Sequence, residues 1–493
     1  MTCPLSQSKE PTIPKPIPFP SQSPIERAFL VGVELKRPRV GAQHLHLRLP
    51  QVQVLIAPLH MRADDSLDEL ERLAETAGLD VVGRAVQHVE RINPATFIGK
   101  GKLEEIIASR ADAPFYIVLF DEELAPNQQR EIETAFESDP EHPASAWVKV
   151  LDRTALILDI FAQHARTKEG ALQVELAQYE YRLPRLTRMW THLARQTGGA
   201  AGRGGTGGVG LRGPGERQLE LDRREIRARI ALLKRQIEEI RKQRGEHRRK
   251  RKREGMPVVA IVGYTNAGKS TLLNTLTIGN GSSPRGVHVA DELFATLDPT
   301  TRRVKLPGGS EALFTDTVGF IQKLPTQLVA AFRATLEEIT EADVLLHVLD
   351  ASHQNVREHA RAVEETLEEI GAGGKPMVVA LNKMDRAQGS SGAEGQGRSW
   401  VTQDEFEREG NAVRISALKG QGLEALLALV EKTIAEEMIE LHVRIPYSAN
   451  ALAALFHQRG IVAREEFTEQ GTLIEGKIAR SLLARFGKFK IRD

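Results

Sequence analysis

Short apolar runs alternate with amphipathic stretches over the first third of the chain. The runs AFLVGVEL, VVGRAVQHV, YIVLF and WVKVLD have the composition of strands, whereas SLDELERLAETAG, LEEIIASR and a segment from Pro126 have helical spacing. Such alternation is typical of an α/β domain with a mainly parallel sheet, which we predict over residues 25–152. Residues 1–24 are rich in proline and serine and have too few apolar side chains for a core, so we expect a disordered tail.

From residue 153 onward, apolar residues recur three and four positions apart. One series comprises Leu172, Leu176, Tyr179, Leu183, Leu186, Trp190 and Leu193, and a second comprises Leu219, Ile226, Ile230, Leu233, Ile237 and Ile240. This spacing places apolar side chains along one face of a helix. We therefore predict two helices that pack antiparallel as a hairpin within residues 153–254.

The stretch GGAAGRGGTGGVGLRGPGE, residues 198–216, separates these two helices. A connection between antiparallel helices needs only about 2 to 8 residues, and this one is much longer. Glycine lets a backbone lie close to RNA, while arginine contacts phosphates or stacks on bases. We interpret the stretch as the binding tip of the hairpin; the alternative is a flexible connector.

The second half of the chain shows apolar strands again. VVAIV, VLLHVLD and MVVAL alternate with helical segments, which favours an α/β domain with a mixed, doubly wound sheet over residues 255–436. Residues 437–493 have the pattern strand, helix, strand, strand, which predicts a small α+β domain. The whole chain is therefore expected to be a multidomain α/β protein.

Composition agrees with a modular, water-soluble chain. At 493 residues it is too long for a single core, and a net charge of +1 argues against a uniformly basic nucleic-acid binder. No apolar run approaches the roughly 20 residues that span a bilayer, so we expect no membrane insertion. The single cysteine, Cys3, lies in a Pro/Ser-rich opening without an apolar signal core, which favours the reducing cytoplasm over secretion.

Two short basic stretches each have two interpretations. Residues 248–253 are consecutive arginines and lysines, which favour a polyanionic partner or a solvated linker. Residues 99–102, GKGK, offer open backbone and positive charge to a phosphate. The alternative for GKGK is a glycine turn before a helix.

The strongest motif lies between an apolar run and a helical segment. It reads Gly263, Tyr264, Thr265, Asn266, Ala267, Gly268, Lys269 and Ser270. Its glycines allow backbone N–H groups to wrap a phosphate, and its lysine adds positive charge at the β- and γ-phosphates. The serine hydroxyl is suited to Mg²⁺. We therefore predict a phosphate-binding loop with Ser270 as a magnesium ligand.

Two later segments have residues suited to sensing a third phosphate. The first is Phe294, Ala295, Thr296, Leu297 and Asp298, and the second is Asp316, Thr317, Val318 and Gly319. We expect the Thr296 hydroxyl to reach Mg²⁺ when a γ-phosphate is bound, and Asp316 to hold a magnesium-bound water. The N–H of Gly319 is expected to contact the γ-phosphate.

Two further motifs are suited to recognise the base of a bound nucleotide. Asn382, Lys383, Met384 and Asp385 follow one strand, and Ser416, Ala417 and Leu418 follow another. The Asp385 carboxylate can accept from guanine N1–H and the exocyclic amine, which adenine does not present. Asn382 is expected to brace the loop, the Lys383 stem to cover the ring, and a backbone N–H of the second motif to contact guanine O6. These motifs in this order predict a GTP-binding domain.

The motifs GYTNAGKS, FATLDPTTR, DTVGFI, NKMD and SAL, with GLRGPGERQLELDRR upstream, resemble the HflX family of translation-factor GTPases over about residues 25–493. The resemblance implies binding to the large ribosomal subunit and its rRNA, with the hairpin loop inserted near the peptidyl-transferase centre. It also implies splitting of stalled or stress-arrested ribosomes. We expect a monomer.

Three features depart from the family pattern. The insertion AAGRGGTGG lengthens the tip, and Arg217 stands where the pattern has threonine, which adds charge there. Residues 389–397 are an insertion between NKMD and SAL, for which we expect disorder.

Phe320 directly follows Gly319, the last residue of the motif Asp316–Gly319. At the corresponding position, Ras-like GTPases have a glutamine that orients the attacking water. We therefore assign no catalytic residue and expect slow GTP hydrolysis without outside help. Asn266 resembles an asparagine that helps to hold K⁺ in potassium-activated GTPases, but it is equally suited to brace the loop.

Three hypotheses follow. The leading one is an enzyme that uses GTP as a switch on the ribosome. The second is an RNA-binding scaffold whose GTP site only sets affinity. The third keeps the GTPase but gives it a non-ribosomal RNA or signalling partner.

Overall fold

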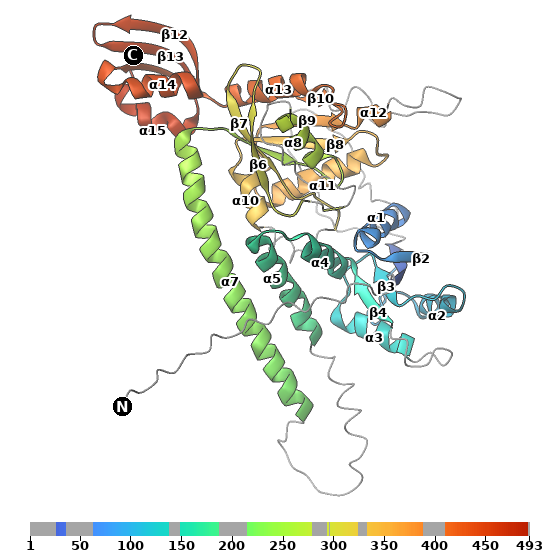
Figure 1. Ribbon diagram of the computed structural model, residues 1–493. Helices are drawn as coiled ribbons and strands as arrows, with labels where there is room; N and C mark the ends of the chain where they lie inside the picture. The colour runs from blue at the N-terminus through green and yellow to red at the C-terminus, as the bar shows by residue number, and fades with distance from the viewer. Residues whose placement is uncertain are drawn as a thin grey trace, which may run out of the picture.

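The computed structural model (Figure 1) describes residues 26–35, 63–137, 148–186, 214–278, 293–294, 296–323, 333–387 and 410–491. Along the chain, a parallel sheet is followed by a pair of long helices, a mixed sheet and a small antiparallel sheet. The predicted fold class is therefore confirmed. The predicted tail, residues 198–213 of the tip and the insertion at 389–397 lie outside the described residues.

The N-terminal part is a parallel sheet in the order β2-β1-β3-β4. Its strands are β1 (Arg27–Leu35), β2 (Asp80–Val89), β3 (Ile117–Phe120) and β4 (Lys149–Asp152). Its helices are α1 (Ala63–Thr76), α2 (Lys100–Ala108), the 3₁₀ turn η1 (Ser109–Ala111) and α3 (Pro126–Glu137). The apolar face of α1 is buried at Leu67, Leu70 and Leu73, as its helical spacing predicts.

The GKGK stretch lies at the start of α2, which begins at Lys100. The N–H of Gly99 donates to Gln87 Oε1 at 2.9 Å, and Lys102 pairs with Glu105 at 2.7 Å. These contacts agree with the turn-before-helix alternative, and phosphate binding by this stretch stays a prediction.

The hairpin follows a short helix, α4 (Arg153–His164), and consists of α5 (Lys168–Arg185) and α7 (Pro214–Glu254). Figure 1 shows α5 and α7 side by side and antiparallel, with α7 continuing to the C-terminal part. Leu233 is fully buried on the predicted apolar face of α7. Ion pairs add to the contact: Glu169 with Arg244 at 2.7 Å and Glu180 with Lys234 at 2.8 Å.

The prediction of a single apolar seam is incomplete for α5. The predicted seam residues Leu172, Leu176, Tyr179 and Leu183 are only half-buried. The buried residues of α5 are Glu169, Gly170, Gln173, Val174, Ala177 and Tyr181. This second face is buried because α5 packs against α4 as well as against α7.

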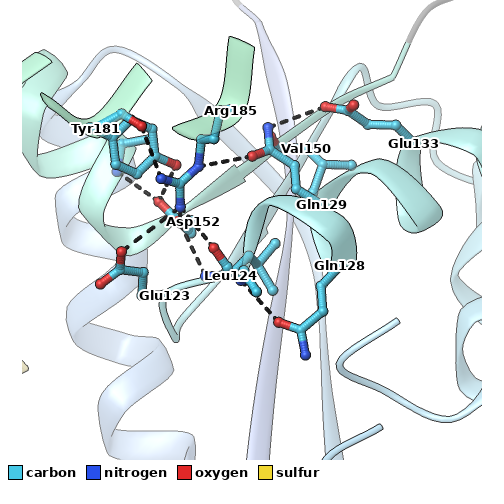
Figure 2. A network of polar contacts seen from close by, with 11 residues as sticks. Glu123, Leu124, Gln128, Gln129, Glu133, Val150, Asp152, Tyr181 and Arg185 are labelled. Carbon is cyan, nitrogen blue, oxygen red and sulfur yellow. Dashed lines mark hydrogen bonds and ion pairs between the residues drawn. The ribbon is translucent and has the colours of Figure 1, made fainter. Parts of the chain in front are cut away.

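A buried carboxylate fixes the end of α5 to the N-terminal sheet (Figure 2). Asp152 Oδ1 accepts hydrogen bonds from the Tyr181 hydroxyl and from Ala155 N, both at 2.8 Å. Its Oδ2 accepts from Arg185 Nη2 and from Leu124 N, both at 3.1 Å. Burial and the neighbouring Asp152 raise the pKa of Tyr181, so its hydroxyl stays protonated and donates.

The third part is a sheet in the order β10-β9-β8-β5-β7-β6, parallel except where β6 pairs with β7. Its strands are β5 (Val258–Val262), β6 (Thr300–Lys305), β7 (Glu311–Asp316), β8 (Val344–Asp350), β9 (Met377–Asn382) and β10 (Ala412–Arg414). Its helices are α8 (Lys269–Ile278), α10 (Arg333–Glu341), α11 (Val356–Glu369), α12 (Met384–Ala387) and α13 (Leu423–Glu436). A mixed sheet with helices on both faces is the predicted arrangement.

The C-terminal part is an antiparallel sheet in the order β11-β13-β12. Its strands are β11 (Ile439–Ile445), β12 (Gly460–Thr468) and β13 (Gly471–Ile478). Its helices are η3 (Tyr447–Ala449), α14 (Asn450–Arg459), η4 (Arg480–Leu482), α15 (Leu483–Phe486) and η5 (Gly487–Phe489). The long helix α7 ends against this part at Gly255, which has φ 63° and where an added Cβ would lie 2.3 Å from Leu482 Cδ1.

The first three parts share one hydrophobic cluster in addition to the cores that lie within single parts. One hydrophobic cluster contains Leu67 of α1, Phe161 of α4, Val174 of α5 and Phe320 beyond β7. The N-terminal sheet, the hairpin and the third part are therefore packed together by shared apolar burial. Within the residues that the structure describes, no helix is both long and apolar enough to cross a membrane.

The network around Asp152 yields a stability prediction. Tyr181→Phe removes the donating hydroxyl and keeps the ring, so we expect the free energy of unfolding to fall by about 1.5–3 kcal/mol. Tyr447→Phe is the control because its hydroxyl donates to Thr468 O, at 2.8 Å, on an exposed surface. The control should change stability by less than about 0.5 kcal/mol. Thermal unfolding measures both, and equal losses would contradict a special role for the network.

Candidate nucleotide-binding site

The predicted phosphate-binding loop connects β5 to α8, and its glycines have conformations that other residues avoid. Gly263 has φ 152°, and an added Cβ would lie 2.3 Å from Val348 O. Gly268 has φ 92°, and an added Cβ would lie 2.4 Å from Asn382 Nδ2. Asn266 lies in the left-handed region, with φ 56°, which asparagine tolerates better than most residues. The loop therefore requires glycine at both predicted positions.

Lys269 is a buried cation enclosed by this loop. Its Nζ donates to Gly263 O at 3.0 Å and to Tyr264 O at 2.8 Å. Burial lowers the pKa of Lys269 to about 8. Asp316 opposes this shift, but burial outweighs it, so an anion bound in the loop would further stabilise the charged form of Lys269.

Ser270, Thr296 and Asp316 come from three separate segments and converge at one point. The hydroxyl oxygens of Ser270 and Thr296 lie 2.8 Å apart. They donate to Asp316 Oδ2 at 2.7 and 3.0 Å, respectively. Burial raises the pKa of Asp316. The sequence prediction that these residues lie near one another therefore agrees with the geometry.

This cluster has the donors that Mg²⁺ requires. Asp316 Oδ1 is buried and has no hydrogen-bond partner among the described residues. Two hydroxyls beside an unsatisfied carboxylate oxygen form a set of hard oxygen donors, which Mg²⁺ prefers. Ser270 and Thr296 would be the side-chain ligands, and Asp316 would accept from a magnesium-bound water.

The second of the two predicted phosphate-sensing segments, residues 316–319 (here called the second switch segment), lies directly against the loop. Thr317 Oγ1 donates to Ile261 O at 2.7 Å, and the Val318 side chain is buried in the core. At Gly319, an added Cβ would lie 2.8 Å from Thr265 Cγ2 and 3.1 Å from Lys269 Nζ. The Gly319 backbone therefore lies beside Thr265 and Lys269 of the loop, and its contact with a γ-phosphate stays a prediction.

Phe320 is part of the core and not of an open site. Thr265 N donates to Phe320 O at 2.8 Å, and Phe320 N donates to Gly263 O at 3.1 Å. The Phe320 side chain is 2% exposed. A buried phenyl ring has no means of orienting an attacking water, which agrees with the absence of an assigned catalytic residue.

The two base-selecting motifs are held together by Asn382. Its Nδ2 donates to Ala267 O at 2.8 Å, and its Oδ1 accepts from Ala417 N at 2.9 Å. Asp385 Oδ1 accepts from Ser416 Oγ at 2.6 Å, and this hydrogen bond lowers the pKa of Asp385. Asn382 thus braces both motifs against the phosphate-binding loop, as expected.

The side chains of Met384 and Leu418 point to different surroundings. Met384 is buried in the core, whereas Leu418 is 74% exposed. If these residues contact the base as predicted, Met384 therefore does so through its backbone. Ala295 lies outside the described residues.

Sequence reasoning missed a charge partner for the base-selecting motif. Lys383 has φ 62°, and its Nζ lies 2.8 Å from Asp350 Oδ2. Asp350 ends β8, the strand next to β9 in the sheet. A carboxylate that directly follows the apolar run VLLHVL was the available signal, because neighbouring parallel strands end at the same edge of the sheet.

Sequence reasoning also missed the contacts of Tyr264 outside the nucleotide site. Its hydroxyl donates to Glu69 of α1 and accepts from Gln322 N at 2.9 Å. Its ring stacks on His359 of α11, with centroids 3.8 Å apart. A residue of the phosphate-binding loop therefore contacts the N-terminal part directly.

Known families match most of the chain. Residues 64–162 match "GTP-binding GTPase N-terminal", 164–251 "GTP-binding GTPase Middle Region", 258–383 "50S ribosome-binding GTPase" and 402–481 "HflX C-terminal domain". GTPase HflX of Lacrimispora saccharolytica is 42% identical, over 86% of this chain and 91% of its own. GTPase HflX of Escherichia coli is 40% identical, over 83% and 88%, respectively. The chain belongs to the HflX family of GTPases.

The HflX resemblance of the motifs is thereby confirmed along the chain, from the N-terminal part to the C-terminal part. GTPase HflX of Caldanaerobacter subterraneus, 42% identical over 89% of this chain and 93% of its own, extends over the same parts. Since the chain belongs to a family of GTPases, GTP is the implied substrate.

Base selection gives a direct test of Asp385. Asp385→Asn replaces an acceptor that reads two guanine donors, so we expect GTP affinity to fall by about a hundredfold or more. Xanthine carries an oxygen where guanine has the amine, so the affinity for XTP should rise. Glu424→Gln, an exposed carboxylate in the first turn of α13, is the control. Unchanged GTP affinity in Asp385→Asn would remove the base-reading assignment.

The magnesium assignment is tested at Ser270. Ser270→Ala removes one hydroxyl ligand, and we expect about a tenfold rise in the Mg²⁺ concentration that supports half-maximal GTP binding. The control is Ser310→Ala, because the Ser310 hydroxyl donates to Glu431 at 2.8 Å, away from the site. The measurement is a Mg²⁺ titration of GTP binding; equal midpoints in the two variants would exclude Ser270 as a ligand.

Proposed function

We propose that this HflX-family GTPase binds the large ribosomal subunit and its rRNA, and that it uses GTP to act on stalled ribosomes by splitting them into subunits. The match to a family described as 50S ribosome-binding GTPase supports this proposal. The observation that carries it is the hairpin. α7 has 41 residues, which corresponds to about 60 Å, and its start lies far from the nucleotide site (Figure 1).

The nucleotide site supplies the switch. The loop around Lys269 would bind the phosphates, and a Mg²⁺ held by Ser270 and Thr296 would neutralise charge on the β- and γ-phosphates. Asp385 would select guanine. We also propose that K⁺ binds near Asn266. The protein is proposed to act as a monomer in the cytoplasm.

Hydrolysis is expected to be slow without a partner. Phe320 is buried in the core, so this position offers no group that orients water. A ribosomal component would then position the water or add positive charge at the γ-phosphate.

We also propose that the parts fold as the domains 25–152, 153–254, 255–436 and 437–493.

Sedimentation with ribosomes tests the proposal. The full-length protein should pellet with large subunits in the presence of a non-hydrolysable GTP analogue, less so with GDP, and its GTP turnover should rise about tenfold or more. Binding without stimulation would favour the RNA-binding scaffold. Absence of binding would favour a non-ribosomal partner.

The tip provides a sharper prediction. Replacing residues 198–213 with a short turn should leave GTP affinity within about twofold, because none of the predicted nucleotide-binding residues lies in this stretch. It should lower subunit splitting and stimulated turnover about tenfold or more. Deletion of residues 389–397, another glycine-rich stretch, is the matched control and should change neither. Full activity of the tip variant would show that the tip is only a connector.

A further inference from the structure

Asp298 lies in the first predicted phosphate-sensing segment, residues 294–298 (here called the first switch segment), and binds the N-terminal end of the hairpin helix α5. Its Oδ2 accepts from Arg166 N at 3.1 Å and from Thr167 N at 2.8 Å. The Thr167 hydroxyl donates to Asp298 Oδ1. Thr167 is the N-cap of α5, and its Oγ1 also accepts from Gly170 N at 3.0 Å. The carboxylate therefore completes the capping of α5, where a negative charge is also favoured by the helix dipole.

The same segment carries the proposed magnesium ligand Thr296. The Thr296 hydroxyl lies at Ser270 and Asp316, as described above. Thr296 and Asp298 are two positions apart, so their Cα atoms can be separated by at most about 7 Å. A larger displacement of one of them therefore also displaces the other. One short segment thus has one end at the nucleotide site and the other at the hairpin.

Phe294 and Leu297 of this segment, and the backbone of Leu293 just before it, contact the N-terminal part and α4. The Phe294 ring packs edge-on against Phe161 of α4, with centroids 4.6 Å apart. Leu293 N lies 3.4 Å from Thr76 Oγ1 at the end of α1. Leu297 is buried in the cluster that joins the three parts. The position of the switch segment therefore depends on elements that precede the GTPase domain in the chain.

We propose that Asp298 is a positioning residue that couples Thr296, and hence the binding of Mg²⁺ and GTP, to the placement of the hairpin. This inference rests on the proposed role of Thr296 at the nucleotide. Coupling between two sites is reciprocal. GTP therefore favours the hairpin placement in which α5 is capped by Asp298, and a partner that holds the hairpin in this placement favours GTP over GDP.

Gly170 allows the coupling to be separated from the stability of α5. An added Cβ at Gly170 would lie 2.6 Å from Asp298 Oδ1, so alanine there displaces the carboxylate. Alanine also has the higher helix propensity. A purely structural role for Asp298 and the proposed coupling thus predict different outcomes for Gly170→Ala.

The test uses the full-length protein and two variants. Asp298→Ala removes the carboxylate, and Gly170→Ala displaces it. Gly245→Ala in α7 is the matched control, because an added Cβ there meets nothing within 4 Å. The measured quantity is the ratio of the affinities for a non-hydrolysable GTP analogue and for GDP, at fixed Mg²⁺. Both variants should lower this ratio about threefold to thirtyfold, and the control should leave it unchanged.

Amide hydrogen exchange of residues 166–170 gives a readout that does not depend on affinity. In the parent, the GTP analogue should slow exchange there relative to GDP, and Asp298→Ala should abolish the difference. Unchanged affinity ratios in both variants, or equal exchange with both nucleotides in the parent, would refute the coupling. These experiments need no ribosome, so a failure of ribosome binding and a failure of the coupling can be distinguished. A parent protein that binds no GTP would refute both the proposed function and the coupling.

Discussion

The buried guanidinium of Arg153 is the constraint around which the first three parts of the molecule assemble. Arg153 is 1% exposed, and it pairs with Glu69 of α1 and, at 2.7 Å, with Asp121 after β3. Burial by itself would lower the pKa of Arg153, but the two carboxylates raise it above its ordinary value. A buried charge that loses its partner costs several kcal/mol, so α1, β3 and α4 have to meet at this point.

The same cluster extends into the GTPase domain. Lys323, just beyond the second switch segment, binds Asp121 and lies 2.8 Å from Glu122. Burial opposes ionisation of Asp121, yet Arg153 and Lys323 hold its pKa below the usual range. Glu69 in turn accepts from Tyr264 of the phosphate-binding loop. The N-terminal part therefore contacts both segments between which a γ-phosphate would lie.

Two consecutive residues at the junction of β4 and α4 make contacts in opposite directions, one toward α5 and one toward the GTPase domain. Asp152 binds Tyr181 and Arg185 near the end of α5, while Arg153 belongs to the cluster at the GTPase domain. The helix α5 is thus attached near its C-terminal end by Asp152 and at its N-terminal end by Asp298. α5 therefore connects the buried carboxylate of Asp152 in the N-terminal part with Asp298 in the GTPase domain.

The sequence by itself determined the elements and the local chemistry. Period-2 and period-3.6 patterns identified the strands and helices, and Gly263, Gly268, Asn382 and Asp385 were identifiable because a phosphate-wrapping turn and guanine each demand particular residues within a few positions. Only the tertiary structure decided which surfaces meet. Asp298 caps a helix that lies 131 residues earlier, and α5 buries a second face, because hydrophobic periodicity records that a residue is buried but not which residue covers it.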